Sequence, residues 1–257
     1  MTGPNDHEGQ YLYCVIRSSE PRQFSNLGMG GRGDIVHTVH FDDLAAVVSD
    51  SPSAEYENTR RNMMAHTVVL EEVMQGFPIL PVRFGTVAPD EGLVRDRLLK
   101  RRFGELHYLL SDMDGLVELG LKAFWYEGII FDEVLAESPD IRELRDKLVR
   151  RSADETYYDR IHLGEMVEAA MNRKRLEDSE HILSRLRPLV GKTRKNPEIT
   201  DRMVLNAAFL LEAERQPAFD AELQALDAEM GGRLIFKYVG PVPPYNFVSI
   251  VIRWDEE

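Results

Sequence analysis

The segment Tyr11-Leu12-Tyr13-Cys14-Val15-Ile16 is apolar at every position. Because neither face of such a strand can be left in water, this run predicts a central strand of a sheet. Cys14 is the only cysteine of the chain, so no intramolecular disulfide can form, and a reducing compartment is indicated. We interpret Cys14 as a buried thiol within that strand rather than as a nucleophile. The fold must then be stabilised by apolar packing, which a chain of 257 residues can provide without disulfides or metal.

Strand patterns and helix patterns alternate over the first half of the chain. The β-branched runs on either side of Asp42-Asp43 predict a hairpin, and Asn58 or Thr59 can cap the helix that follows. That helix is apolar on most sides, so we expect more than one neighbour to cover it. The segment 18–33 is rich in turn residues. In order, the predicted elements are a strand at 11–16, the hairpin at 35–41 and 44–49, a helix at 59–75, an edge strand at 77–84 and, after the cap Asp90, a helix that reaches residue 110.

The second half begins with an alternating strand. The odd-numbered residues of 117–123 are apolar and share one face, whereas Glu118 and Lys122 point to the other. Pro217 fits the first turn of a later helix, which Gly231-Gly232 ends. The predicted elements are this strand, a charged helix at 140–151, a long helix at 155–186, a strand at 203–212, a helix at 217–230 and a strand at 233–239.

Both halves therefore show the order of strands and helices of an incomplete or decorated split βαβ unit. We predict an α+β fold of two packed domains with ferredoxin-like character, the second enlarged by long helices. The first domain covers residues 1–114, and the second, which ends in a proline-rich segment, covers residues 115–257. The boundary falls at Ser111–Gly115, and no Pro-rich or Gly/Ser-rich linker separates the halves.

The charge of the chain excludes several classes of partner. Lys and Arg number 31 and Asp and Glu number 44, which gives a net charge of −13. Binding to nucleic acid or to anionic lipid requires a positive surface, so we expect neither partner. No run approaches the ~18 apolar residues of a membrane span, and residues 1–10 lack the apolar stretch of a secretory signal. We predict a soluble, cytoplasmic protein.

The motifs that resemble catalytic or cofactor sites have the wrong context. The glycines of Gly28–Gly33 match a dinucleotide-binding spacing, but a strand follows them, where a nucleotide site needs a strand before and a helix after. His37 and His40 lie on opposite faces of one strand and cannot readily share a metal. His66 and Glu71 are five residues apart, which is not the spacing of two ligands on a helix, and we interpret His66 as a hydrogen-bonded core residue. We therefore expect no catalytic residue, no cofactor and no metal.

Two proline-containing segments are candidates for a functional surface. In Pro81-Val82-Arg83-Phe84, a buried arginine between apolar residues would need a carboxylate or carbonyl partner. The segment is either an edge strand with a paired arginine or a partner surface, and we predict that Arg83 is paired. In Pro241-Val242-Pro243-Pro244, the prolines fix an extended path, and Tyr245 and Phe247 follow it. These aromatic residues either seal a domain core or form a partner-binding ridge.

At these two segments the sequence resembles the gas vesicle protein F/L family (GvpF/GvpL). The resemblance runs from about residue 10 to residue 253 and is most specific near the C-terminal end. The family often has tryptophan in place of Val242 and serine in place of Asn246. The matching residues are Tyr11-Leu12-Tyr13, Leu44-Ala45-Ala46-Val47-Val48-Ser49, His66, Pro81-Val82-Arg83-Phe84-Gly85-Thr86 and Gly240-Pro241-Val242-Pro243-Pro244-Tyr245-Asn246-Phe247-Val248.

The resemblance implies a minor, non-enzymatic component of gas vesicles, the hollow protein shells that make aquatic microbes buoyant. Such a protein is expected to bind the small, very hydrophobic major shell protein, and other gas vesicle proteins, and to assist vesicle formation in the cytoplasm. The alternative, from a different functional class, is an enzyme or sensor with a closed pocket that holds His66, Arg83 and a carboxylate. The candidate partner-interface residues are Pro81, Arg83, Phe84, Pro241, Pro243, Pro244, Tyr245 and Phe247.

Overall fold

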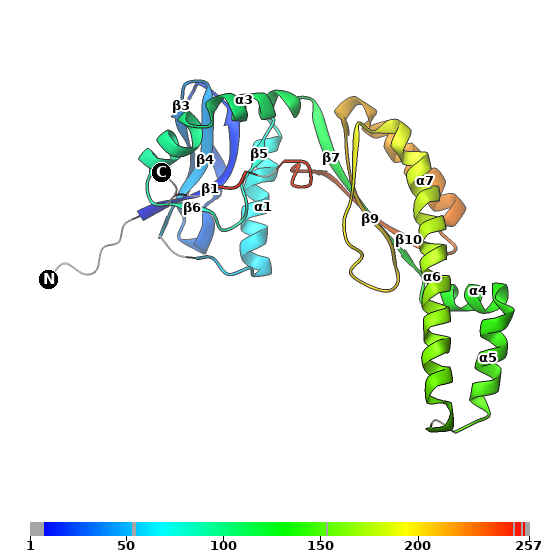
Figure 1. Cartoon of the computed structure of the whole chain (residues 1–257). Coiled ribbons are helices and arrows are strands. Elements are labelled where there is room, and N and C mark those ends of the chain that lie inside the picture. The colour runs from blue at the N-terminus through cyan, green and yellow to red at the C-terminus, as the bar shows by residue number, and fades with distance from the viewer. Residues whose placement is uncertain (1–7, 53–54, 153, 249, 253, 255–257) are drawn as a thin grey trace. The chain divides into compact units, whose positions relative to one another are not determined.

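The computed structural model describes residues 8–52, 55–152, 154–248, 250–252 and 254 of the chain (Figure 1). The chain divides into two compact units. Unit 1 comprises Met1–Glu118 together with Pro241–Glu257, and unit 2 comprises Leu119–Gly240. Residues 1–7, part of the segment in which we expect no secretory signal, lie outside the described residues. Of the helices in the described ranges, none combines the length and the apolar character needed to span a bilayer.

The fold is α+β, as predicted, and the sheet of unit 1 is antiparallel. Its strands follow the order β2-β3-β4-β1-β5, and β6 also pairs with β1. β1 lies between β4 on one side and β5 and β6 on the other, and its apolar run from Tyr11 to Ile16 is fully buried, which confirms the predicted central strand. The strands are β1 (Glu8–Arg17), β2 (Gln23–Leu27), β3 (Ile35–Phe41), β4 (Leu44–Pro52), β5 (Leu80–Pro81) and β6 (Val87–Ala88).

Two parts of this sheet differ in how well the sequence predicts them. β3 and β4 form the predicted hairpin, and Asp42 in its turn has a φ of 55°, which Asp tolerates better than most residues. β2 lies in the segment that we predicted only as turn-rich; its residues alternate between exposed and half-buried, a weak pattern in so short a strand. The predicted strand at 77–84 is a strand only at Leu80–Pro81, since proline at positions 78 and 81 removes two backbone donors.

Helix α1 (Arg60–Met74) begins where the sequence predicts. The side chain of Thr59 accepts a hydrogen bond from the Asn62 backbone nitrogen and caps it. α1 packs against β1, β2 and the short helix η1 (Met29–Gly31), which confirms that more than one neighbour covers it. Met63 and Met64 are nevertheless 51% and 56% exposed, so one face of the helix is open. The buried residues of α1 are His66, Val69, Leu70 and Val73.

The helical segment after Asp90 is divided rather than continuous. Asp90 caps it as predicted, because its side chain accepts a hydrogen bond from Leu93 N at 2.8 Å. Leu99, Phe103, Leu106 and Leu110 have the i, i+4, i+7, i+11 spacing of one helix face; the three leucines are buried and Phe103 is half-buried. A π-helical stretch interrupts the segment. The remaining helices of unit 1 are η1 (Met29–Gly31), α2 (Glu91–Leu93), the π-helix η2 (Val94–Lys100) and α3 (Phe103–Asp112).

Most of the second sheet belongs to unit 2, and its strand order is β10-β7-β9-β8. β9 (Met203–Glu212) has the predicted bounds, and β7 and β10 lie near theirs. β8 was not predicted, because Lys-Thr-Arg-Lys has no apolar alternation and forms an edge strand. The other strands are β7 (Leu116–Trp125), β8 (Lys192–Lys195) and β10 (Leu234–Val242).

The long helix α6 (Tyr157–Leu186) is the largest element of unit 2 and confirms the predicted helix at 155–186. α5 (Pro139–Val149) lies beside the N-terminal part of α6, with α4 close to both (Figure 1). α7 carries proline in its first turn and ends before Gly231, as predicted. The other helices are α4 (Ile129–Glu137), which was not predicted, α7 (Gln216–Met230), η3 (Asp154–Thr156), η4 (Arg187–Leu189) and η5 (Ala213–Arg215).

Candidate functional site

A cavity of about 320 Å³ opens on unit 1, a volume at the lower end of the range of ligand sites. Its wall combines residues of α1 with the segment after β5 and with the C-terminal segment of unit 1. Candidate interface residues that lie in this wall are Pro81, Arg83, Phe84 and Tyr245. The other lining residues are Met63, His66, Thr67 and Val248. The structure thus brings together the two proline-containing segments that the sequence singled out.

The remaining candidate residues lie outside the wall. Pro241 is exposed, Pro243 and Pro244 are buried, and Phe247 is half-buried. Sequence reasoning missed Met63, Thr67 and Val248. For the residues of α1 a signal existed, because positions 63, 66 and 67 have the i, i+3, i+4 spacing that places side chains on one helix face.

His66 forms the inner part of the wall. It is 2% exposed, and its Nδ1 lies 3.0 Å from the Tyr11 hydroxyl, which confirms the interpretation as a hydrogen-bonded core residue. The ring stacks on Tyr13 with centroids 5.6 Å apart and meets Phe84 edge-on. Burial lowers the pKa of His66 to about 4, so the imidazole is neutral at pH 7.

The hydrogen bonds of Tyr11 assign the tautomer of His66. The Tyr11 hydroxyl oxygen accepts a hydrogen bond from the Gly85 backbone nitrogen at 3.1 Å, and we assign its own proton to the hydrogen bond with His66 Nδ1. The neutral ring then carries its single proton on Nε2. Nε2 is buried and has no hydrogen-bond partner within the described residues. His66, one of the lining residues, therefore holds a buried N–H donor that has no partner within the described residues.

Arg83 differs from its prediction. Its side chain is exposed, and in the described part of the chain its guanidinium has no ion pair and no hydrogen bond; the predicted pairing with a carboxylate or with carbonyl groups is wrong. The physical reason is a turn: the Arg83 carbonyl accepts hydrogen bonds from the Thr86 backbone nitrogen and hydroxyl, and Gly85 supplies a φ of 82°. This turn carries the chain away from the sheet directly after β5, so the side chain reaches solvent.

The C-terminal segment is held by Glu118. The sequence places this residue on the face of β7 opposite the apolar residues, and it is 2% exposed. Its carboxylate accepts hydrogen bonds from the backbone nitrogen and the side-chain nitrogen of Asn246. The Phe247 and Val248 backbone nitrogens donate to the Pro244 carbonyl. This tether and turn place Tyr245, which is 41% exposed, in the cavity wall.

The motifs dismissed in the sequence have structural positions. Gly28 precedes η1, and a side chain there would meet the Ser49 side chain at 2.5 Å, so it is a packing glycine. His37 lies near Glu91, and His40 contacts Thr38. Cys14 is buried, and burial raises the pKa of its thiol, as expected for an unreactive strand cysteine. Within the described ranges, His, Cys, Asp and Glu form no group able to hold a metal ion.

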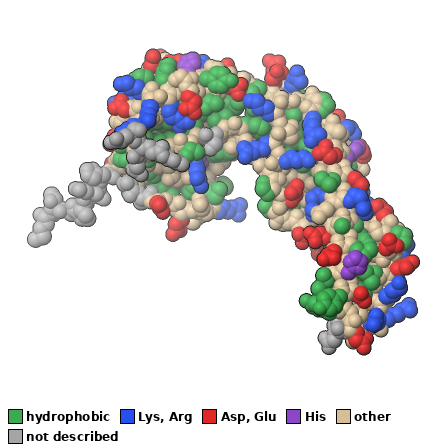
Figure 2. Space-filling model, in the orientation of Figure 1, with side chains coloured by type: hydrophobic (Ala, Val, Ile, Leu, Met, Phe, Trp, Pro, Cys, Tyr) green, Lys and Arg blue, Asp and Glu red, His purple; other side chains and the backbone are tan. Residues whose placement is uncertain are grey.

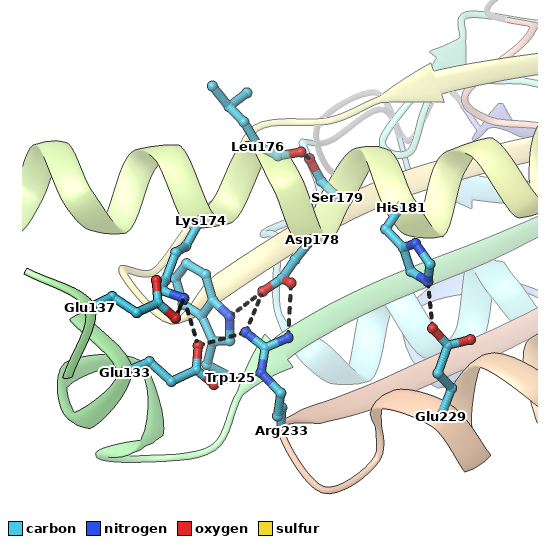
Figure 3. A network of polar contacts seen from close by, with 10 residues as sticks. All are labelled: Trp125, Glu133, Glu137, Lys174, Leu176, Asp178, Ser179, His181, Glu229 and Arg233. Carbon is cyan, nitrogen blue, oxygen red and sulfur yellow. Dashed lines mark hydrogen bonds and ion pairs between the residues drawn. The ribbon is translucent and has the colours of Figure 1, made fainter. Parts of the chain in front are cut away.

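Unit 2 contains a second concentration of polar groups, a charged network (Figure 3). Asp178 of α6 accepts hydrogen bonds from the buried Trp125 indole at 2.8 Å and from Arg233 at 3.0 Å. Arg233 also binds Glu133 of α4, and this hydrogen bond lowers the pKa of the Glu133 carboxyl. Lys174 completes the link to α4. Because these charges are paired with one another, the network connects α4, α6 and the sheet, and we interpret it as structural.

The comparisons with known proteins identify the family. The family model described as Gas vesicle synthesis protein GvpL/GvpF matches residues 9–249. The chain belongs to the GvpL/GvpF family. Gas vesicle protein F of Streptomyces sp. (strain CB03234) is 35% identical over 244 residues, which cover 93% of this chain and 99% of that protein. Gas vesicle protein F of Microcystis aeruginosa (strain PCC 7806) is 27% identical, with 95% of this chain and 99% of that protein covered.

Two solved structures of GvpF share the fold. The crystal structure of GvpF from Anabaena sp. PCC7120 matches with a TM-score of 0.82 and 25% identity, over 95% of this chain and 100% of that one. The crystal structure of GvpF from Microcystis aeruginosa matches with a TM-score of 0.76 and 27% identity, over 93% and 98% of the two chains. The resemblance drawn from the sequence motifs is thus confirmed, and GvpL/GvpF is a gas vesicle family and not an enzyme family.

Proposed function

We propose that this GvpL/GvpF protein is a non-catalytic assembly component that binds the hydrophobic major shell protein, and other gas vesicle proteins, in the cytoplasm during vesicle formation. The observation that supports binding is the cavity of unit 1, in which Met63 and Tyr245 expose 51% and 41% of their surface. Large apolar side chains that border a hollow and remain exposed are typical of protein-binding surfaces. The enzyme alternative needs a carboxylate beside His66 and Arg83, and the lining residues include none.

The charge of the chain fits the same role. A net charge of −13 gives repulsion between complexes that carry an aggregation-prone partner. On the face shown in Figure 2, acidic and basic side chains are interspersed rather than gathered by sign. An apolar hollow within such a charged surface can hold a hydrophobic segment while the complex stays dispersed.

We also propose that both units are variants of the ferredoxin-like fold. In unit 2, the chain order β7, helices, β8, β9, α7, β10 and the sheet order β10-β7-β9-β8 support a split βαβ arrangement. In unit 1, the sheet order β5-β1-β4-β3 supports the same arrangement. Here β2 occupies the position in the sequence, between β1 and β3, where the first helix of that arrangement would lie.

Co-purification of the major shell protein tests the proposed function, and two neighbouring methionines provide a matched pair. Met63→Gln places a polar amide in the cavity wall and is expected to lower the amount of shell protein that co-purifies several-fold. Met64→Gln changes an equally exposed residue that does not line the cavity, and is expected to behave as the unmodified protein. Equal recovery of the shell protein with both variants would place its binding surface elsewhere.

A further inference from the structure

His66 and Arg83, two polar residues of the cavity wall, both offer hydrogen-bond donors. His66 contributes a buried Nε2–H donor without a partner in the described part of the chain. Arg83 contributes an exposed guanidinium, and none of the described residues that line the wall is a carboxylate. Buried donors that are left unpaired cost free energy, and a ligand that accepts their hydrogen bonds recovers it. The missing complement is therefore an acceptor, and beside Arg83 it is an anionic one.

The rest of the wall is apolar. Met63, Pro81, Phe84 and Val248 surround the two polar groups, and Tyr245 adds its ring. Burial raises the pKa of the Tyr245 phenol, and the carboxylates of Glu71 and Glu118 raise it further. Neither carboxylate lines the cavity, and Glu118 accepts the hydrogen bonds of Asn246. A fully hydrated anion such as free phosphate would leave these apolar side chains without contacts. The wall instead suits a ligand with an apolar body next to its charge.

We propose that this cavity binds a carboxylate attached to an apolar group, as found at the C-terminus of a polypeptide whose last residue is apolar. Arg83 pairs with the carboxylate at the entrance, His66 Nε2–H donates to one of its oxygens or to the adjacent carbonyl, and the apolar side chain lies against Met63 and Phe84. A volume of about 320 Å³ accommodates a single terminal residue rather than a long segment. Capture of a terminal carboxylate is a known mode of peptide recognition. This inference rests on the proposed function only in taking a polypeptide as the partner.

The test uses the full chain and short synthetic probes. Isothermal titration compares the peptide acetyl-Ala-Ala-Leu with a free carboxylate against the same peptide with an amidated C-terminus. We expect the free acid to bind at least tenfold more tightly. Arg83→Gln is expected to abolish this preference, whereas Arg150→Gln, an exposed arginine of unit 2, is expected to retain it. Acetyl-leucine is the third probe; if it binds as tightly as the tripeptide, one terminal residue supplies all the contacts.

A second readout follows the buried donor directly. In a nitrogen-15 spectrum, the Nε2–H resonance of His66 is expected to shift when the free acid is added and to stay in place with the amide. Equal affinity for acid and amide, an undiminished preference in Arg83→Gln, or an unmoved His66 resonance would each overturn the proposal. These results are independent of the shell protein. Loss of shell-protein co-purification in Met63→Gln without a carboxylate preference would support the proposed function and refute this site. A carboxylate preference together with unchanged co-purification in Met63→Gln would support this site and refute the proposed function.

Discussion

Glu118 and Asn246 are 128 positions apart in the sequence, and the Glu118 carboxylate accepts hydrogen bonds from both nitrogens of Asn246, at 3.0 and 2.5 Å. Glu118 is the last residue of the first part of unit 1, and Asn246 belongs to the part that returns after unit 2. The pair fixes the turn that precedes Phe247 and Val248 and thereby positions Tyr245. A buried carboxylate at the start of β7 thus controls one wall of the cavity.

Removing the Glu118 carboxylate tests whether it holds the C-terminal segment in place. Glu118→Ala leaves the Asn246 donors without their acceptor and is expected to lower the free energy of unfolding by about 1–3 kcal/mol. It should also weaken binding at the cavity, since Tyr245 loses its support. Urea unfolding and peptide titration measure the two effects. Glu127→Ala, at an exposed position, serves as the control, and a Glu118→Ala protein as stable as this control would mean that the pair does not hold the segment.

The aromatic residues on either side of Asn246 are expected to separate binding from stability. Phe247 is half-buried, so Phe247→Ala should lower the free energy of unfolding by about 1–3 kcal/mol through lost apolar burial. Tyr245→Ala should mainly reduce co-purification of the major shell protein. Tyr108→Ala removes an exposed tyrosine of α3 outside the cavity and should do neither. If Tyr245→Ala binds normally and melts early, the segment is a structural seal.

Arg83 is expected to contribute little to stability. Because its guanidinium is exposed and has no ion pair in the described ranges, Arg83→Ala should change the free energy of unfolding by less than about 0.5 kcal/mol, as most surface substitutions do. Denaturant titration measures this directly. A loss of 2 kcal/mol or more, of the size typical of a broken buried pair, would show that the exposed position is not the one that Arg83 occupies in solution.

The lowered pKa of His66 predicts that the free energy of unfolding depends on pH. Its pKa falls from the ordinary 6.5 to about 4 on folding, so the unfolded chain binds a proton at a pH where the folded chain does not. Stability is therefore unaffected by His66 above pH 6.5 and is lost as the pH falls from 6.5 towards 4, by about 3 kcal/mol in total. Comparison of urea midpoints at pH 7, 5.5 and 4.5 between the native chain and His66→Phe isolates this slope. An identical slope in both proteins would contradict the assignment.

Two variants in the charged network of unit 2 are expected to lower stability by different amounts. Asp178→Ala removes the acceptor of the buried Trp125 indole and one partner of Arg233, and is expected to lower the free energy of unfolding by about 2–4 kcal/mol. Glu137→Ala breaks the exposed pair with Lys174 and should cost no more than about 0.5 kcal/mol. Similar losses in the two variants would show that the network acts through general charge rather than through the buried hydrogen bonds.

The elements that the sequence predicts well are those with local signals. The hairpin of β3 and β4, the cap at Thr59 and the helix that starts near Pro217 depend on neighbouring residues, and the structure confirms them. β2 and β8 are polar strands whose pairing is decided by partners distant in the sequence. The predicted domain boundary near residue 114 stays a prediction.

The candidate site was harder to predict from the sequence than the fold. Its segments were recognised from prolines, aromatic residues and the family resemblance, but their meeting with α1 depends on tertiary packing. The exposure of Arg83 was not predicted, because it depends on the turn at Gly85. The burial of Glu118 could not be read from the alternation of β7, because alternation along a strand does not reveal which neighbour covers a face. The unused donor of His66 follows only once Tyr11 and Gly85 are placed.

The division of unit 1 into two stretches of sequence has a consequence for synthesis of the protein. A ribosome that has translated residue 240 has made all of unit 2 but not residues 241–257 of unit 1. Until those residues emerge from the exit tunnel, the cavity lacks Tyr245 and Val248, and Glu118 lacks Asn246. The proposed partner-binding surface is therefore completed only after residues 241–248 have been made, so a chain that stops before them is expected not to compete with finished molecules for a partner.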